Sequence, residues 1–537
     1  MLKITLLALN SSYSHTNLAV RCIKKSLNDA GISANFLEFS LKDKRGTILS
    51  ALFNAGASIY GFSTYIWNRR EMLSLASDLK KLCPNAKIIF GGPEVSFDTE
   101  SLLFDNQFID CVIVGEGEDA FVRIARMVEA GEELPKVYDG AEFKDFERAG
   151  ILYNNEEKVD RKLIYYESSR GCPYRCAYCL SSLSGRVRAK PAEQVLSEIS
   201  QFEQFDGIKV IKFVDRTFNF DKKRARIIWN GLLDPKFTKC CHFEICGELL
   251  DEEDFELLSR FPRGKIQLEI GVQSTNSETL ERVGRKTDIP KLLAAISRLH
   301  SFGNMHIHAD LIAGLPGESF ERFGKSFDDL FGRCDMLQLG FLKLLRGSRL
   351  RNEACSFGCI YSDDPPYEVL ATDCLSFNEI ELLHRIDDLN ERYFNSDAFK
   401  RACAILTKNI ESPFEFLKKM ATDFEREGLS IREISQARAY SELFDRAGKY
   451  LPADRLADFA TALSLDFLTS QKTSLPKFGD FDFQRTDDSE LKRKFCRFAE
   501  GKFEFFAPAL EVHAGKFVVD RKNLTAFQLV NDEFVQI

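Results

Sequence analysis

Three cysteines, Cys172, Cys176 and Cys179, constrain this chain more than any other feature, because their C-x3-C-x2-C spacing gathers three thiols in one short loop. The loop follows an apolar run at residues 163–167 that is typical of a β-strand. Thiolates are the soft ligands of iron–sulfur clusters, and three of them leave one iron of a 4Fe–4S cube without a protein ligand. The sequence therefore predicts a strand that leads into a cluster loop with one open iron.

A structural zinc site is the alternative for these cysteines. Zinc normally closes its shell with four protein ligands. The next cysteine or histidine after Cys179 is Cys240, followed by Cys241 and His242, far along the chain. This spacing favours the three-cysteine cluster.

Length and composition limit the other possibilities. The chain has 537 residues, enough for about two to four domains. Its net charge of -8 offers no basic excess for nucleic acid or a membrane surface, and no apolar run reaches the ~20 residues that span a bilayer. Cysteines outside the loop lack regular spacing and the N-terminus leads directly into a strand-like pattern, so we expect a reducing, cytoplasmic setting.

Residues 1–140 alternate strand and helix patterns, which predicts a doubly wound, Rossmann-like α/β domain with a parallel sheet. The expected strands are 4–9, 34–38, 58–62, 86–90 and 110–114, and the expected helices lie near 17–30, 46–55, 68–83 and 118–130. Loops after the carboxyl ends of such strands line a ligand crevice. The candidate ligand-binding residues there are Ser11, Ser63, Thr64, Gly91, Gly92, Glu94, Gly115, Glu116 and Gly117.

The alternative for these loops is that their glycines simply end strands. No G-x-G-x-x-G follows the first strand, so a dinucleotide site is not supported.

A polar linker is expected over residues 141–161, and alternation resumes over 162–345. The expected strands are 163–167, 208–214, 242–246, 265–271, 306–312 and 336–341, with helices near 191–204, 221–233, 251–260, 289–302 and 318–331. Six strand–helix units are too few for a closed eight-fold barrel, so we predict a partial (β/α)6 TIM barrel whose active face lies at the strands' carboxyl ends.

Residues 346–537 form an extension without a catalytic motif. It is expected to be mainly helical over 367–470. Short strands are expected at 502–506, 510–513 and 516–519, with Ala514–Gly515 as a hairpin turn.

Cys172, Cys176, Tyr178 and Cys179 match a C-x3-C-x-aromatic-C signature, and on these residues the chain resembles the radical S-adenosylmethionine (SAM) superfamily. The resemblance implies a 4Fe–4S cluster whose open iron binds SAM through its amino and carboxylate groups. It also implies reductive cleavage of SAM to a 5'-deoxyadenosyl radical, with electrons from a reductant such as flavodoxin or ferredoxin.

The same resemblance implies a SAM site. Asp215 corresponds loosely to a family motif that contacts the methionine ammonium. Glu244 corresponds to the family's ribose-binding residue. The remaining implied SAM-binding residues are Tyr178 beside the cluster, Gln273 and Ser274 near the nucleoside, and Gly314 and Pro316 near adenine. The alternative is that the acids are exposed strand ends and the Gly-Pro pair an ordinary turn.

Segments 61–64, 91–94 and 115–118 carry a resemblance to the cobalamin-binding domain of one radical SAM subgroup, which includes methyltransferases and an oxygen-independent cyclase. The D-x-H-x-x-G motif that supplies an axial histidine in other cobalamin proteins is absent, and His15 is the only histidine before His242. Any bound cobalamin is therefore expected to lack a histidine ligand. A degenerate domain that binds nothing is the alternative.

The resulting hypothesis is a cobalamin-dependent radical SAM enzyme that transfers a methyl group to an unactivated carbon of a small molecule or peptide. His306 and His308 lie on one face of a strand and are candidate substrate or acid–base groups, although a hydrogen-bonded polar interior would look the same.

Two other functions stay open. One is a rearrangement, a cyclase reaction or a methylthiotransferase-type reaction, for which Cys355, Cys359 and Cys374 could hold a second cluster, although the pattern favours buried or inert cysteines. The other is a non-catalytic, metal-stabilised protein that binds RNA or another partner.

Overall fold

The computed structural model describes residues 2–140, 143, 146, 150–153 and 162–470, together with five strands between residues 483 and 536. The chain divides into two compact units, Met1–Glu318 with Gly340–Ser376, and Ser319–Leu339 with Phe377–Ile537. Most of the predicted linker lies outside the described residues, and the predicted domain boundaries remain predictions.

The first unit begins with a six-stranded parallel sheet of order β2-β1-β3-β4-β5-β6. Its strands are β1 (Ile4–Asn10), β2 (Ala34–Ser40), β3 (Ile59–Ser63), β4 (Lys87–Gly91), β5 (Cys111–Gly115) and β6 (Val137–Gly140). Its helices are α1 (Leu18–Asp29), α2 (Arg45–Ala55), α3 (Arg69–Leu82), α4 (Thr99–Asp105) and α5 (Gly117–Ala130).

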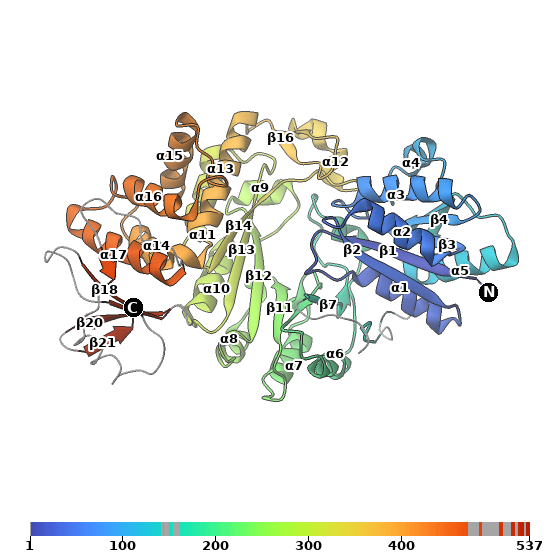
Figure 1. Ribbon diagram of the computed structural model, residues 1–537, viewed down its shortest axis with the longest axis horizontal. Helices are drawn as coiled ribbons and strands as arrows, with labels where there is room; N and C mark the ends of the chain where they lie inside the picture. Colours follow the sequence, from blue (N-terminus) through green and yellow to red (C-terminus); the bar gives the residue numbers. More distant parts are fainter. Residues whose placement is uncertain are drawn as a thin grey trace. The chain divides into compact units, whose positions relative to one another are not determined.

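Helices cover both faces of this sheet (Figure 1). One buried cluster joins β-strand side chains to α2, α3 and α4, and a second joins the opposite face to α1 and α5. Strands buried on both faces are continuous hydrophobic runs, and all seven residues of β1 are buried. This packing confirms the predicted Rossmann-like fold.

The barrel sheet has the order β14-β13-β12-β11-β10-β7. Its strands are β7 (Ile164–Tyr166), β10 (Val210–Phe213), β11 (Cys240–Ile245), β12 (Ile266–Gln273), β13 (His306–Ala313) and β14 (Met336–Phe341). The helices between them are α6 (Ala192–Ser200), α7 (Lys222–Leu232), α8 (Glu252–Ser259), α9 (Ser277–Arg282), α10 (Ile289–Ser301) and α11 (Phe320–Leu330). Six strands confirm the predicted partial barrel.

Several short elements were not predicted. They are α4, α9, the edge strand β6, the β8 (Ser169–Arg170) and β9 (Arg188–Ala189) ribbon, and the β15 (Ile360–Tyr361) and β16 (Val369–Ala371) pair. Each is too short to show a hydrophobic period. The prediction that residues 367–470 are mainly helical is confirmed over residues 377–470, whereas residues 369–371 form β16.

The second unit is mainly helical, with α13 (Phe377–Tyr393), α14 (Lys400–Thr407), α15 (Pro413–Arg426), α16 (Gln436–Ala447) and α17 (Ala453–Ser470). An antiparallel sheet follows, made of β17 (Phe483–Arg485), β18 (Glu504–Pro508), β19 (Phe517–Asp520), β20 (Thr525–Val530) and β21 (Glu533–Gln536). The predicted strands 502–506 and 516–519 correspond to β18 and β19, whereas 510–513 and the turn lie outside the described residues.

Within the described residues, none of the helices has the length and hydropathy needed to cross a membrane.

Gly61 offers a test of the sheet's packing. A Cβ at Gly61 would lie 2.6 Å from Leu6 Cδ2 and 2.8 Å from a ring carbon of Phe121. We expect Gly61→Ala to lower the free energy of unfolding by about 1–3 kcal/mol, measured by denaturant titration. Gly46→Ala in α2, where nothing lies within 4 Å, is the control and should be neutral or stabilising. Equal effects of the two substitutions would contradict this account.

Candidate active site

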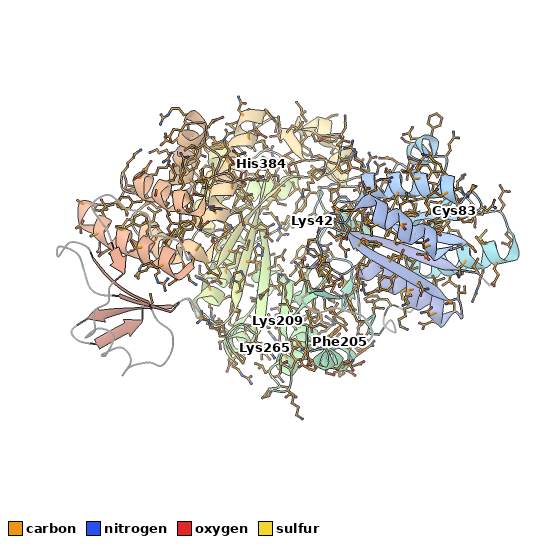
Figure 2. All side chains as sticks on the ribbon, viewed as in Figure 1. Lys42, Cys83, Phe205, Lys209, Lys265 and His384 are labelled. Carbon is orange, nitrogen blue, oxygen red and sulfur yellow. The ribbon has the colours of Figure 1, made fainter. Side chains whose placement is uncertain are left out.

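The cluster loop leaves the carboxyl end of β7, whereas Lys209 and Lys265 precede β10 and β12 at the opposite end of the strands (Figure 2). Cys176 is 5% exposed, and Cys172 and Cys179 are partly exposed. The loop is therefore at the barrel's predicted active face.

Backbone hydrogen bonds hold this loop in place. Ala177 N donates to Val283 O at 2.8 Å, and Leu350 N donates to Ala177 O at 2.9 Å. Cys172 Sγ lies 3.6 Å from Thr217 Oγ1. The loop is thus supported from the segments that follow β12, β14 and β10.

Arg285 supplies a positive charge beside the thiols. Its Nη1 lies 4.0 Å from Cys176 Sγ, and its Nη2 donates to Gly271 O. Burial opposes its charge, but Tyr178 and Cys176 raise the pKa of Arg285. A soft thiol set beside a fixed cation fits a negatively charged iron–sulfur cluster.

In the described part of the chain, no three His, Cys, Asp or Glu side chains converge on a site for one metal ion. The three thiolates of a cube bind three separate irons, so convergence on one point is not required of them. Cys355 and Cys374 are exposed and Cys359 is buried.

Asp215 is fully buried at the carboxyl end of β10 and faces the start of the cluster loop. Its carboxylate accepts from Ser168 N at 3.1 Å, from Ser168 Oγ at 2.7 Å, and from Ser169 Oγ. Arg224 Nη2 also donates to Ser168 Oγ, at 2.7 Å. Burial raises the pKa of Asp215 although these serines donate to it. Asp215 therefore orients the loop entry, and its contact with SAM stays a prediction.

The other predicted SAM residues surround the ends of β11, β12 and β13. Glu244 is partly buried with Arg216 Nη1 3.8 Å away, and burial raises the pKa of Glu244. Gln273 has a left-handed φ of 73° at a register shift between β12 and β13. Ser274 is buried and donates to Glu318.

Gly314 and Pro316 form the buried loop after β13. Gly314 has φ 89°, and a Cβ there would lie 2.6 Å from Val369 Cγ1. Glycine at this position is therefore required by packing, and the loop's approach to adenine stays a prediction.

One face of the barrel sheet is polar. Lys212 Nζ and His242 Nε2 each lie 3.2 Å from Glu269 Oε2. Burial opposes ionisation of Glu269, but His242 and Lys212 outweigh it and lower its pKa to about 2.

His308 lies on the same face, because it is directly opposite Glu269 in the pairing of β13 with β12. Its Nε2 lies 3.3 Å from Asp310 Oδ1. His306 pairs with Gln267 and is exposed. Both histidines are on the predicted face, and their contact with substrate stays a prediction.

The glycine-rich loops of the N-terminal sheet meet at one cavity. Its volume is about 120 Å³, and its other lining residues are mostly apolar groups of α1, α5 and the strands β1, β3, β4 and β5. Five predicted cobalamin residues line it: Ser63, Gly91, Gly92, Gly115 and Gly117. Glycine backbone and apolar side chains fit a flat, largely apolar part of a ligand.

The remaining predicted cobalamin residues lie outside this lining. Ser11 is exposed. Thr64 is fully buried, and its backbone N donates to Gly91 O at 2.8 Å. Glu94 is 3% exposed and accepts from Tyr367 Oη at 2.8 Å. His15 Nδ1 lies 2.5 Å from Tyr165 Oη, so this histidine is hydrogen-bonded to a side chain of β7.

Arg170 joins the two predicted cofactor regions. Its guanidinium donates to Glu116 at 2.9 Å, to Glu118 at 2.8 Å and to Glu167 at 2.8 Å. Glu116 also pairs with Arg188. The loop after β5 is therefore tied to a residue only two positions before Cys172.

The sequence did not single out Arg170, Arg285 or Tyr367. Arg170 lies next to the signature cysteines, so its position was available as a signal. Arg285 and Tyr367 sit among other arginines and aromatics, and nothing local distinguishes them.

Sequence comparisons divide the chain into three matched regions. The model of the radical SAM superfamily matches residues 166–330, and that of the B12 binding domain matches residues 4–125. A third model, described as a protein of unknown function (DUF4080), matches residues 355–516.

The chain is similar to an uncharacterized methyltransferase of Pyrococcus horikoshii, with 28% identity over 48% of this chain and 62% of that protein. It is also similar to the cobalamin-dependent radical SAM methyltransferase TokK of Streptomyces tokunonensis, with 23% identity over 49% of this chain and 43% of that protein. The chain spans about half the length of the curated relatives it matches.

Solved structures share the fold. The cobalamin-dependent radical enzyme OxsB, with aqua-cobalamin and SAM bound, has a TM-score of 0.56 at 14% identity over 87% of this chain and 84% of its own. The methyltransferase TsrM from Kitasatospora setae has a TM-score of 0.54 at 16% identity over 68% of this chain and 80% of its own.

Asp310 gives a test of the polar face. Burial and the charges of Glu269 and Glu244 raise its pKa to about 8. The native state therefore holds a proton that the unfolded chain releases above about pH 4, so stability from this group falls as pH rises from 4 through 8.

In the wild type, this group should lower the free energy of unfolding by up to about 1.4 kcal/mol for each pH unit of increase. We expect Asp310→Asn to abolish this pH dependence in denaturant titrations between pH 5 and 9. His306→Gln, on the same strand but exposed, is the control. Parallel pH profiles for the wild type and the Asp310 variant would contradict the assignment.

The cluster loop starts a partial parallel barrel, and a B12-type sheet with a glycine-lined cavity precedes it in the same unit. These features and the two sequence models agree on both the fold and its order along the chain. The chain therefore carries a B12-binding domain followed by a radical SAM domain.

Proposed function

We propose that this protein is a cobalamin-dependent radical SAM methyltransferase that methylates an unactivated carbon of a small molecule or peptide. The observation that carries the proposal is the Arg170 bridge, because it ties the loop that borders the glycine-lined cavity to the entry of the cluster loop. A methyl-carrying cofactor and a radical-forming cofactor would then share one reaction space.

The residues have distinct roles in this proposal. Cys172, Cys176 and Cys179 hold three irons, and Arg285 balances the charge of the thiolates. Asp215 orients the loop entry through Ser168. When bound, the cluster and SAM supply the radical, and cobalamin supplies the methyl group.

SAM would be positioned by Tyr178, Glu244, Gln273, Ser274 and the loop that contains Gly314 and Pro316. Substrate would meet the polar face that contains His308 and Asp310, where a protonated Asp310 can donate a hydrogen bond. Radical SAM chemistry needs an external one-electron donor, and we propose flavodoxin or ferredoxin in the reducing cytoplasm.

A cyclase or methylthiotransferase-type reaction remains the alternative function. The curated relatives include an anaerobic magnesium-protoporphyrin IX monomethyl ester cyclase of Synechocystis, 24% identical over 42% of this chain and 49% of that protein. The methyl group of the product distinguishes these reactions.

The first test removes the cluster ligands. We expect the combined Cys172→Ala, Cys176→Ala and Cys179→Ala variant to lose cluster iron and SAM cleavage, because the cube then has no thiolates, while corrinoid binding persists. Iron analysis and chromatographic detection of 5'-deoxyadenosine measure these outcomes. Cys355→Ala with Cys374→Ala, two exposed cysteines, is the control. If the triple variant still cleaved SAM, the proposal would be wrong.

The second test follows the methyl group. Anaerobically prepared protein should show corrinoid absorbance, and incubation with CD3-labelled SAM and a metabolite extract should give a product in which CD3 replaces hydrogen. Mass spectrometry detects the product, and omission of cobalamin from reconstituted protein should abolish it. Label incorporation as a methylthio group, or without cobalamin, would favour the alternative.

A further inference from the structure

A segment that follows the barrel connects its last strands to the N-terminal sheet. Residues 342–369, which we call the strap, leave β14, include α12 (Arg349–Asn352) and β15, and return at β16. Leu342 N donates to Ala313 O at 2.9 Å, and Val369 N donates to Leu342 O at 2.9 Å. Both ends of the strap are thus anchored beside Gly314.

Tyr367 makes the strap's contact with the N-terminal sheet. It is 0% exposed, and its hydroxyl donates to Glu94 Oε2 at 2.8 Å while accepting from Arg346 Nε at 2.9 Å. Arg346 also pairs with Asp98 at 2.7 Å. One tyrosine and one arginine therefore hold both ends of the segment 94–98.

Backbone and side-chain contacts within the strap fix the conformation of Tyr367. Tyr367 has a left-handed φ of 59°, and its carbonyl accepts from Leu344 N at 2.9 Å. The Arg351 guanidinium lies 4.8 Å from the Tyr367 ring centroid and donates to Leu344 O at 2.6 Å. A non-glycine residue keeps such a φ only where its surroundings determine it.

Shape complementarity adds to the hydrogen bonds. Gly347 has φ 80°, and a Cβ there would lie 2.2 Å from a ring carbon of Phe97. The strap backbone therefore touches the Phe97 ring directly.

The segment held by the strap begins at the cavity. Gly91 and Gly92 line it, and a Cβ at Gly92 would lie 2.4 Å from Thr64 O. Glu94 follows two residues later and is itself buried. A displacement of Glu94 would therefore move the glycine backbone that lines the cavity.

We propose that Tyr367 is a positioning residue for cobalamin binding. Its hydrogen bond to Glu94 fixes the loop after β4, which lines the cavity. The inference rests on the proposed function, because the ligand of the cavity is cobalamin only if that function is correct. Glu94, which the sequence suggested as a direct contact, acts in this proposal through the loop.

The substitution Tyr367→Phe removes only the hydroxyl. The Glu94 carboxylate stays buried but loses a donor, which is costly for a charged group, so the loop is expected to shift or loosen. Tyr361→Phe is the matched control, because Tyr361 is a tyrosine of the same strap and the Arg351 guanidinium lies 5.0 Å from its ring centroid.

The test titrates hydroxocobalamin into cofactor-free full-length protein and follows corrinoid absorbance. We expect Tyr367→Phe to weaken binding roughly tenfold, as loss of one charge-assisted hydrogen bond can, and Tyr361→Phe to leave it unchanged. Hydrogen exchange of residues 91–98, without cobalamin, should rise in the Tyr367 variant alone.

Three results would separate the explanations. Wild-type affinity in Tyr367→Phe would overturn the positioning role. Equal weakening in both variants would assign the effect to general packing of the strap and also overturn it. Absence of hydroxocobalamin binding by the wild type, with SAM cleavage intact, would instead refute the proposed function.

Discussion

The ion-pair group around Arg170 is the interaction on which the active region depends. One guanidinium contacts carboxylates from the loop and helix after β5 and from the strand end before the cysteines. All four side chains are mostly buried, so loss of the cation would leave three carboxylates poorly compensated, a cost of about 3–5 kcal/mol for buried pairs. The same contact that stabilises the unit also sets the cluster loop against the B12-type sheet.

Buried carboxylates in this structure orient loops as well as line the polar face of the barrel sheet. Asp215 and Glu94 looked like ligand contacts in the sequence, yet each is buried and accepts hydrogen bonds from protein groups. Asp310 and Glu269 differ, because they face a polar sheet surface and their pKa values move in opposite directions, to about 8 and about 2. Groups with divergent pKa values on one face are suited to proton transfer or hydrogen-bond donation.

Much of the fold follows from local patterns. β1 was predictable because a strand buried on both faces leaves a continuous apolar run, and α5 because an amphipathic helix leaves a clear period in the sequence. The edge strand β6 and the short helix α4 leave no such period, since one is half exposed and the other has seven residues. The strap was missed for a related reason, because its two-residue and three-residue strands are defined by their contacts rather than by hydropathy.

By itself, the sequence determined the α/β class and the order of the two domains, and it predicted the three cluster cysteines, because these depend on spacing and periodicity along a short stretch. Only the tertiary structure decided which polar residues remain available to a ligand. Tyr367 and Glu94 are 273 residues apart, and their hydrogen bond exists because the strap packs against the loop after β4. No local pattern encodes such a pairing, since it depends on how distant segments are brought together.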